Sequence, residues 1–103
     1  LDWEIIEISD GSNWYRVFNW CDNARDTNTN VDYVILTVPV TPPDPEEVDQ
    51  RPIATGDLYN GTGVAINIDA LVPPGTYTFI RFYAPTGDVD GGAEIDALEI
   101  LPP

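Results

Sequence analysis

The chain has 103 residues, which fits one domain, 1–103, with a hydrophobic core of modest size. It carries 18 Asp and Glu against four Arg, with neither Lys nor His, for a net charge of −14. Such a surface excludes nucleic acid and anionic membranes as partners, because both require a basic patch. No apolar run approaches the roughly 18 residues of a membrane-spanning helix, so no membrane insertion is expected.

Strand patterns recur along the chain, and no segment sustains a helical period. The segments 2–8 and 14–20 flank the turn Asp10–Asn13, so they are predicted to pair as a hairpin. Further on, the residues Val64, Ile66 and Ile68 alternate with polar or small ones, as in a half-buried strand. About seven strands are expected in an all-β fold, an antiparallel β-sandwich or jelly roll; the later ones are 31–40, 64–69, 76–84 and 93–101.

The single cysteine, Cys21, rules out a disulfide within the chain. We expect it to be a small buried side chain beside Trp20. A free thiol or a bond to a second chain is the alternative for a secreted protein. The lack of Lys, His and Met, with much Thr, Asn, Gly and Pro, is typical of secreted β-proteins. The absence of an initiator Met indicates either a processed chain or a module of a longer protein.

Two stretches, "EISDGSNWYRV" and "GTYTFIRFYAPTGDVDGGAEIDALEIL", resemble galactose-binding-like or discoidin-like β-sandwich modules of bacterial secreted and cell-surface proteins. In that family one strand carries serine, Asp-Gly and tryptophan, matched here by Ser9, Asp10, Gly11 and Trp14. A later strand and the last strand are matched by Phe79, Ile80, Arg81, Phe82, Ile95, Asp96, Ala97, Leu98 and Glu99. The resemblance implies a β-sandwich at the surface of a cell or outside it.

The chain departs from that family because the strands that normally precede the serine and Asp-Gly segment are absent. A sandwich without those strands exposes a sheet edge, and a sheet edge invites pairing with a neighbour. Self-association is therefore expected through "LDWEIIEI" or "AEIDALEILPP", the two ends of the chain.

Catalytic side chains are scarce. Without His or Lys, neither a Ser-His-Asp nor a Cys-His arrangement can form. Zinc sites need Cys or His, and only one such residue exists. Paired carboxylates can cleave glycosides, but no pair is marked out among the acids. The sequence thus predicts a protein that is not an enzyme.

The segment "DTNTNVD" suggests calcium, because side-chain oxygens recur at alternate positions and hard cations prefer oxygen ligands. An EF-hand is excluded, since Val31 stands where the loop needs Gly and Thr37 where it needs Glu. The alternative is that these side chains bond their own backbone in turns. The candidate ligands are Asp26, Asn28, Asn30 and Asp32 and, in a second group, Asp88, Asp90, Glu94 and Asp96; the resemblance places a calcium near Asp96.

Carbohydrate binding is the rival function, because aromatic rings stack on sugars and arginines bond hydroxyl groups. The expected ligand-binding residues are Trp3, Arg16, Tyr59, Arg81 and Tyr83. In strict alternation Trp14, Phe18 and Trp20 share one strand face with Arg16, which also predicts a cation–π ladder without ligand, and Trp14 and Trp20 are equally typical of the core.

The sequon at Asn60 fits an exposed glycosylation acceptor in a turn. The composition and the resemblance together favour an extracellular or cell-surface module with a structural or adhesive role. A self-assembling filament or surface-layer subunit is the specific form of that prediction. A carbohydrate-binding module for an extracellular glycan is the alternative, and calcium is the one cofactor expected.

Overall fold

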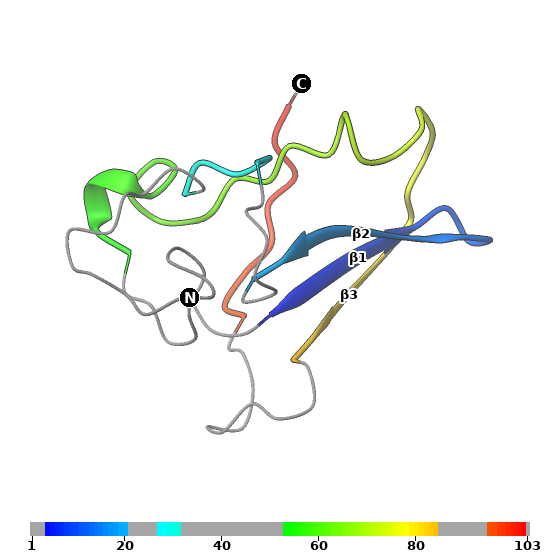
Figure 1. Cartoon of the computed structure of the whole chain (residues 1–103), viewed down its shortest axis with the longest axis horizontal. Helices are drawn as coiled ribbons and strands as arrows, with labels where there is room; N and C mark the ends of the chain where they lie inside the picture. The colour runs from blue at the N-terminus through cyan, green and yellow to red at the C-terminus, as the bar shows by residue number, and fades with distance from the viewer. Residues whose placement is uncertain (1–3, 21–26, 32–52, 85–94, 103) are drawn as a thin grey trace.

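The computed structural model describes residues 4–20, 27–31, 53–84 and 95–102. These residues form one antiparallel sheet of three strands, β1 (Ile5–Ser9), β2 (Trp14–Asn19) and β3 (Phe79–Tyr83), and one short 3₁₀ turn, η1 (Thr55–Asp57). The strand order is β2-β1-β3, so the first strand in sequence lies at the centre of the sheet (Figure 1). No helix among the described residues has the length and apolarity to cross a bilayer.

The hairpin of β1 and β2 forms as the sequence predicts. Asp10 caps the turn, since its Oδ1 accepts the backbone N–H groups of Ser12 and Asn13, both at 2.8 Å. Those N–H groups also hold the pKa of Asp10 below its ordinary value, because they stabilise the carboxylate. Gly11 turns the chain at a φ of +97°, a conformation that glycine adopts without steric cost.

Strand β3 pairs with the free side of β1 from far along the chain. Its register sets Arg81 opposite Glu7 and Phe82 opposite Ile6. β-branched and aromatic residues favour this extended segment. Two partners therefore flank β1, and all its residues are buried.

A β-bulge in β2 decides which side chains reach the core. The register shifts between Ile6 and Glu7, so Val17 is an extra residue opposite them. The shift reverses the alternation, and the consecutive residues Val17 and Phe18 are both buried. The predicted common face of Trp14, Arg16, Phe18 and Trp20 is therefore wrong.

The core lies on one face of the sheet, and the described residues that cover it, in 27–31 and 53–77, contain no regular strand. Its buried side chains are Ile6, Ile8, Val17, Phe18, Trp20 and Val31. The ring of Phe18 stacks on Trp20 at 6.3 Å. The residues Val64, Ile66 and Ile68 pack against this cluster, as their alternation predicted.

Two of the expected later strands are wrong in the described residues. The segment 64–69 forms only an isolated bridge, Thr29 to Ile66, because its backbone meets the short stretch 27–31. The described part of the last expected strand, 95–101, has no strand structure. The expected strand 31–40 lies almost wholly outside the described residues, as does Cys21. The all-β class with an antiparallel sheet is confirmed in the described residues, while the arrangement of about seven strands stays a prediction.

Candidate interaction surface

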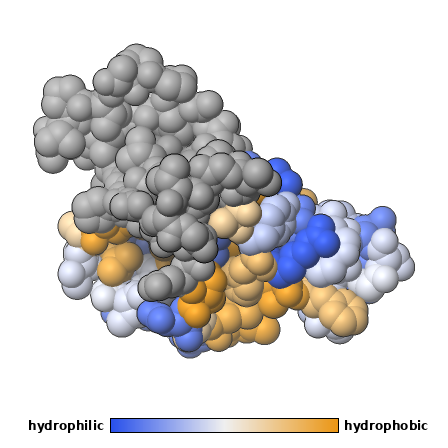
Figure 2. Space-filling view, turned by 90° about the horizontal axis from the view of Figure 1, so that it is seen from below, coloured by the Kyte–Doolittle hydropathy of each residue, from blue (hydrophilic) through white to orange (hydrophobic). Residues whose placement is uncertain are grey.

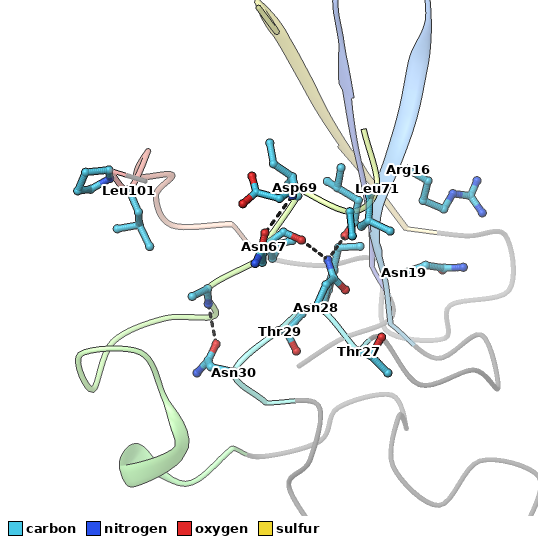
Figure 3. Close-up of a pocket in the computed structure, with 17 residues that line it drawn as sticks. Arg16, Asn19, Thr27, Asn28, Thr29, Asn30, Asn67, Asp69, Leu71 and Leu101 are labelled. Carbon is cyan, nitrogen blue, oxygen red and sulfur yellow. Dashed lines mark hydrogen bonds between the residues drawn. The ribbon is translucent and has the colours of Figure 1, made fainter. Parts of the chain in front are cut away.

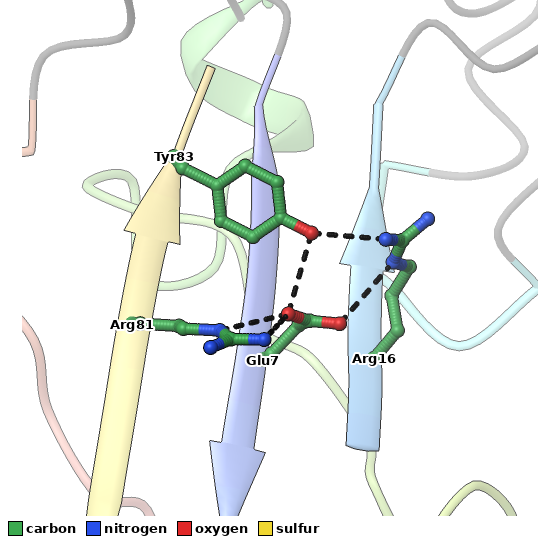
Figure 4. A network of polar contacts seen from close by, with 4 residues as sticks. All are labelled: Glu7, Arg16, Arg81 and Tyr83. Carbon is green, nitrogen blue, oxygen red and sulfur yellow. Dashed lines mark hydrogen bonds and ion pairs between the residues drawn. The ribbon is translucent and has the colours of Figure 1, made fainter. Parts of the chain in front are cut away.

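The sheet face opposite the core carries a polar network centred on Glu7 (Figure 4). Pairing brings an arginine from each neighbouring strand to this carboxylate, Arg16 from β2 and Arg81 from β3. Arg81 donates to Glu7 Oε1 from Nε at 2.8 Å and from Nη2 at 2.6 Å. Arg16 Nε lies 3.6 Å from Glu7 Oε2. One acid thus bridges two cations across three strands.

The hydroxyl group of Tyr83 closes this network. It accepts a hydrogen bond from Arg16 Nη2 at 2.9 Å and donates one to Glu7 Oε1 at 3.3 Å. Burial by itself would raise the pKa of Glu7, but the hydrogen bond and charge of Arg81, the Tyr83 hydroxyl group and the charge of Arg16 together lower it. Glu7 therefore stays ionised at neutral pH.

Aromatic rings surround the network. The guanidinium carbon of Arg81 lies 4.0 Å from the ring centroid of Trp14, a cation–π contact between β3 and β2. Trp14 and Phe79 stand opposite Ser9 on its two sides, and both rings are exposed. The surface formed by Glu7, Trp14, Arg16, Phe79, Arg81 and Tyr83 is called the open face below.

The open face carries one positive charge in excess, because two arginines surround one carboxylate. The chain as a whole carries −14. Seen from below Figure 1, hydrophobic side chains gather beside strongly hydrophilic ones (Figure 2). A surface that combines exposed rings with a local positive charge suits an apolar partner that carries acidic groups.

The outer edge of β3 borders the open face. Among the described residues no strand pairs with this edge. Phe79, Ile80 and Tyr83 are exposed, and Phe79 keeps 58% of its surface. The prediction that "LDWEIIEI" offers the free edge is wrong, because β1 has partners on both sides. The available edge is that of β3.

A groove of about 930 Å³ lies beside β2, at the edge of the sheet that is farther from β3 (Figure 3). Strand β2 forms one wall, the segments 27–30 and 65–71 form another, and Leu101 and Pro102 lie at its border. Amide and hydroxyl side chains line much of the groove: Asn19, Thr27, Asn28, Thr29, Asn30 and Asn67. Arg16 and Asp69 line it as well, so its polar lining combines neutral hydrogen-bonding groups with one cation and one anion.

Two of the predicted calcium ligands build the wall of this groove. Asn28 donates its amide to the carbonyl oxygens of Val17 at 2.9 Å and Asn67 at 3.1 Å. Asn30 accepts the N–H of Ala65 at 2.6 Å and donates to the carbonyl oxygen of Asp57 at 2.7 Å. These two side chains thus join segments that are distant in the sequence. The predicted alternative to a metal was bonding to their own local backbone in turns, and these bonds are not of that kind.

The calcium prediction is otherwise untouched by the structure. Asp96 is exposed, and no group of three or more acidic, Cys or His side chains in the described residues is placed to hold a metal. The other predicted ligands, Asp26, Asp32, Asp88, Asp90 and Glu94, lie outside the described residues. The metal sites therefore stay predictions.

Three of the five predicted ligand-binding residues, Arg16, Arg81 and Tyr83, meet on the open face. Tyr59 lies apart, in a tight turn closed by a hydrogen bond from its N–H to the carbonyl oxygen of Gly63 at 2.8 Å. Trp3 lies outside the described residues. Sequence reasoning missed Glu7, although its place between Ile6 and Ile8 marks the face opposite the core.

Asn60 is exposed at the tip of the same turn, with φ of 51°, next to Gly61 with φ of 72°. Positive φ at both central residues is typical of the turn that Asn-Gly favours. The acceptor is thus accessible, and its glycosylation stays a prediction.

Comparison with protein-family models, with curated proteins and with solved structures gave no match to this chain. The resemblance to galactose-binding-like modules therefore stays a prediction.

Proposed function

We propose that this protein is a non-enzymatic extracellular or cell-surface module of β-sandwich or jelly-roll type. Its proposed role is structural or adhesive, and it associates with itself by pairing at a sheet edge. The observation that carries the proposal is the position of β3, an outer strand with exposed Phe79, Ile80 and Tyr83.

Within the described part of the chain, the edge of β3 lacks the usual protection against pairing. Proteins block exposed edges with lysines, prolines, bulges or inward-pointing charges. Strand β3 has no Lys or Pro, its pairing with β1 has no bulge, and its one charge, Arg81, is bonded to Glu7. Apolar side chains on both of its faces add a hydrophobic contribution to the hydrogen bonds that pairing would form.

Net charge opposes this association and makes it adjustable. Two chains of −14 each repel one another, and salt screens that repulsion over about 10 Å at 0.1 M. Bound calcium would lower the same charge through the acidic loops. Association is therefore expected to increase with ionic strength, and more strongly with calcium.

The lack of reactive side chains supports a role without catalysis. The chain has no His and no Lys, the commonest bases and amine nucleophiles. Glu7, which lies between two cations, has its pKa lowered, whereas a general acid at neutral pH needs a raised one.

Sedimentation velocity across a range of protein and salt concentrations tests the proposal. We expect the wild-type chain to form large assemblies and Phe79→Lys to stay monomeric, because the substitution puts a charge at the edge. Leu71→Lys is the matched control, since it replaces an exposed apolar side chain that lies away from β3 and changes the net charge equally. A wild-type chain that stays monomeric at every salt concentration would refute the proposal.

A carbohydrate-binding module is the second candidate, and the groove beside β2 favours it. Neutral amide and hydroxyl groups that line a groove suit the hydroxyl groups of a sugar. A glycan array with and without calcium tests this function. Binding should be lost in Thr27→Trp, which fills the groove from an exposed position. No signal above background under either condition would exclude the candidate.

A further inference from the structure

The segment 95–102 exposes apolar side chains as no other described segment does. Leu98 keeps 57% of its surface and Ile100 keeps 90%, and Ile95 and Leu101 are exposed as well. The segment has no strand structure, and the hydrogen bonds among the described residues do not include it. An extended segment of this kind gains free energy when it covers these side chains and pairs its backbone.

Two sets of side chains alternate along this segment, as they do along a strand. One set is Leu98 and Ile100, and the other is Ala97, Glu99 and Leu101. Strand β3 alternates in the same way, with apolar residues on the core side of the sheet and an arginine between two rings on the open face. Its core-side residues are Ile80 and Phe82, and its open-face residues are Phe79, Arg81 and Tyr83.

We propose that the segment 95–102 of a second copy of this chain pairs antiparallel with the outer edge of β3, with Glu99 beside Arg81. This inference rests on the proposed self-association and names the segment that carries it. In this register each of the four remaining residues of β3 has an apolar residue of the segment beside it. The pairs are Leu101 beside Phe79, Ile100 beside Ile80, Leu98 beside Phe82 and Ala97 beside Tyr83.

Charge and proline position select this register. Arg81 uses two of its five N–H donors on Glu7, and its side chain is 47% exposed, so it has donors left for a second carboxylate. A slip by one residue would turn Glu99 to the core side of the sheet. In the proposed register Pro102 lies opposite Thr78, beyond the end of β3, where its missing N–H removes no hydrogen bond from the pairing.

The partner is a second copy because the end of this segment in the same chain lies at the opposite edge of the sheet. Leu101 and Pro102 border the groove beside β2, and the order β2-β1-β3 separates that edge from β3 by two strands. One copy thus offers its segment at one edge and accepts a segment at the other. Contacts between two different surfaces continue from copy to copy and build an open filament unless the rotation between copies closes a ring.

Disulfide trapping tests the register in a Cys21→Ser background, which removes the one native thiol. Chains with Ile80→Cys are mixed with chains that carry Ile100→Cys, and we expect a disulfide-linked heterodimer under mild oxidation. Asp96→Cys replaces Ile100→Cys in the control. It lies on the same side of the segment but about 13 Å farther along, so little heterodimer should form.

Charge reversal tests the contact with Arg81. Glu99→Lys should weaken association about tenfold or more, because it places two cations side by side. Asp96→Lys changes the net charge equally and lies past the end of β3, so association should change by less than about twofold.

The outcomes separate this inference from the proposed function. If Phe79→Lys prevents assembly but Glu99→Lys and Asp96→Lys act alike, another segment covers β3 and the inference is overturned, while self-association stands. If the wild-type chain does not associate, both are overturned. A disulfide within one chain carrying Ile80→Cys and Ile100→Cys, formed at high dilution, would show that the chain uses its own segment and would also overturn the inference.

Discussion

The substitution Glu7→Gln tests the network of the open face. The carboxylate accepts two hydrogen bonds from Arg81 and one from Tyr83, and it forms an ion pair with Arg16. A hydrogen bond to a charged group contributes about 1.5–3 kcal/mol when it is well buried. The side chain of Glu7 is only 10% exposed, but those of Arg16 and Arg81 are 48% and 47% exposed, so solvent weakens each contact. Glutamine keeps the shape and one acceptor. We therefore expect the substitution to lower the free energy of unfolding by about 1–2 kcal/mol at pH 7.

The loss should depend on pH. The pKa of Glu7 is lower in the folded chain than its ordinary value of 4.5, which the unfolded chain approaches. The stabilisation is therefore complete above the unfolded value and disappears as the pH falls through the folded pKa. Wild type and Glu7→Gln should differ at pH 7 and converge at lower pH, below the folded pKa.

Urea unfolding followed by tryptophan fluorescence measures both quantities. Asp69→Asn is the matched control, because it removes one negative charge from an exposed position and should change stability by less than about 0.5 kcal/mol. Equal midpoints for Glu7→Gln and wild type at pH 7 would refute the role given to the carboxylate. A difference that persists unchanged at low pH would show that its charge is not the cause.

The remaining predictions concern the core, the groove wall, the hairpin turn and calcium. Phe18→Ala should cost about 3–5 kcal/mol in urea unfolding because it leaves a cavity in the core, whereas Phe79→Ala in dilute monomer should cost less than about 1 kcal/mol. Asn30→Ala should lower stability by about 1–3 kcal/mol and speed hydrogen exchange at the Ala65 amide; unchanged exchange would contradict its bond there. Gly11→Ala should cost about 1–2 kcal/mol, since φ is +97° and the added Cβ would meet nothing closer than 3.9 Å; full stability would show that the turn relaxes. Millimolar calcium should raise the melting temperature relative to protein with chelator, and an unchanged value would count against the predicted metal sites.

Local patterns in the sequence predict the local parts of this fold. Two segments rich in β-branched and aromatic residues flank an Asp-Gly turn, and this pattern predicts the hairpin of β1 and β2. Asp10 caps that turn, as its residue type suggests. The buried face of 64–68 also follows its alternation. In each case the cause lies within a few residues of the effect.

The parts that could not be predicted depend on distant partners. Glu7 and Arg81 are 74 residues apart in the sequence, and no local pattern around either residue predicts their contact. The bulge at Val17 reverses the alternation of β2 and so moves Phe18 from the predicted face to the core. Asn28 and Asn30 resemble metal ligands because of their spacing, yet their amides bond backbone groups up to 39 residues away. The candidate site was thus predicted by residue type and not by geometry.

The central position of β1 has a consequence for synthesis on the ribosome. Its first neighbour, β2, follows at once, and a hairpin closes within about 1–10 μs. Its second neighbour follows only after the chain has reached Tyr83. At about 5–20 residues per second, the nascent chain therefore spends several seconds with one side of β1 uncovered. Neighbouring nascent chains on one messenger RNA could pair there by mistake, so a binding factor that shields β1 during translation should raise the yield of correctly folded protein.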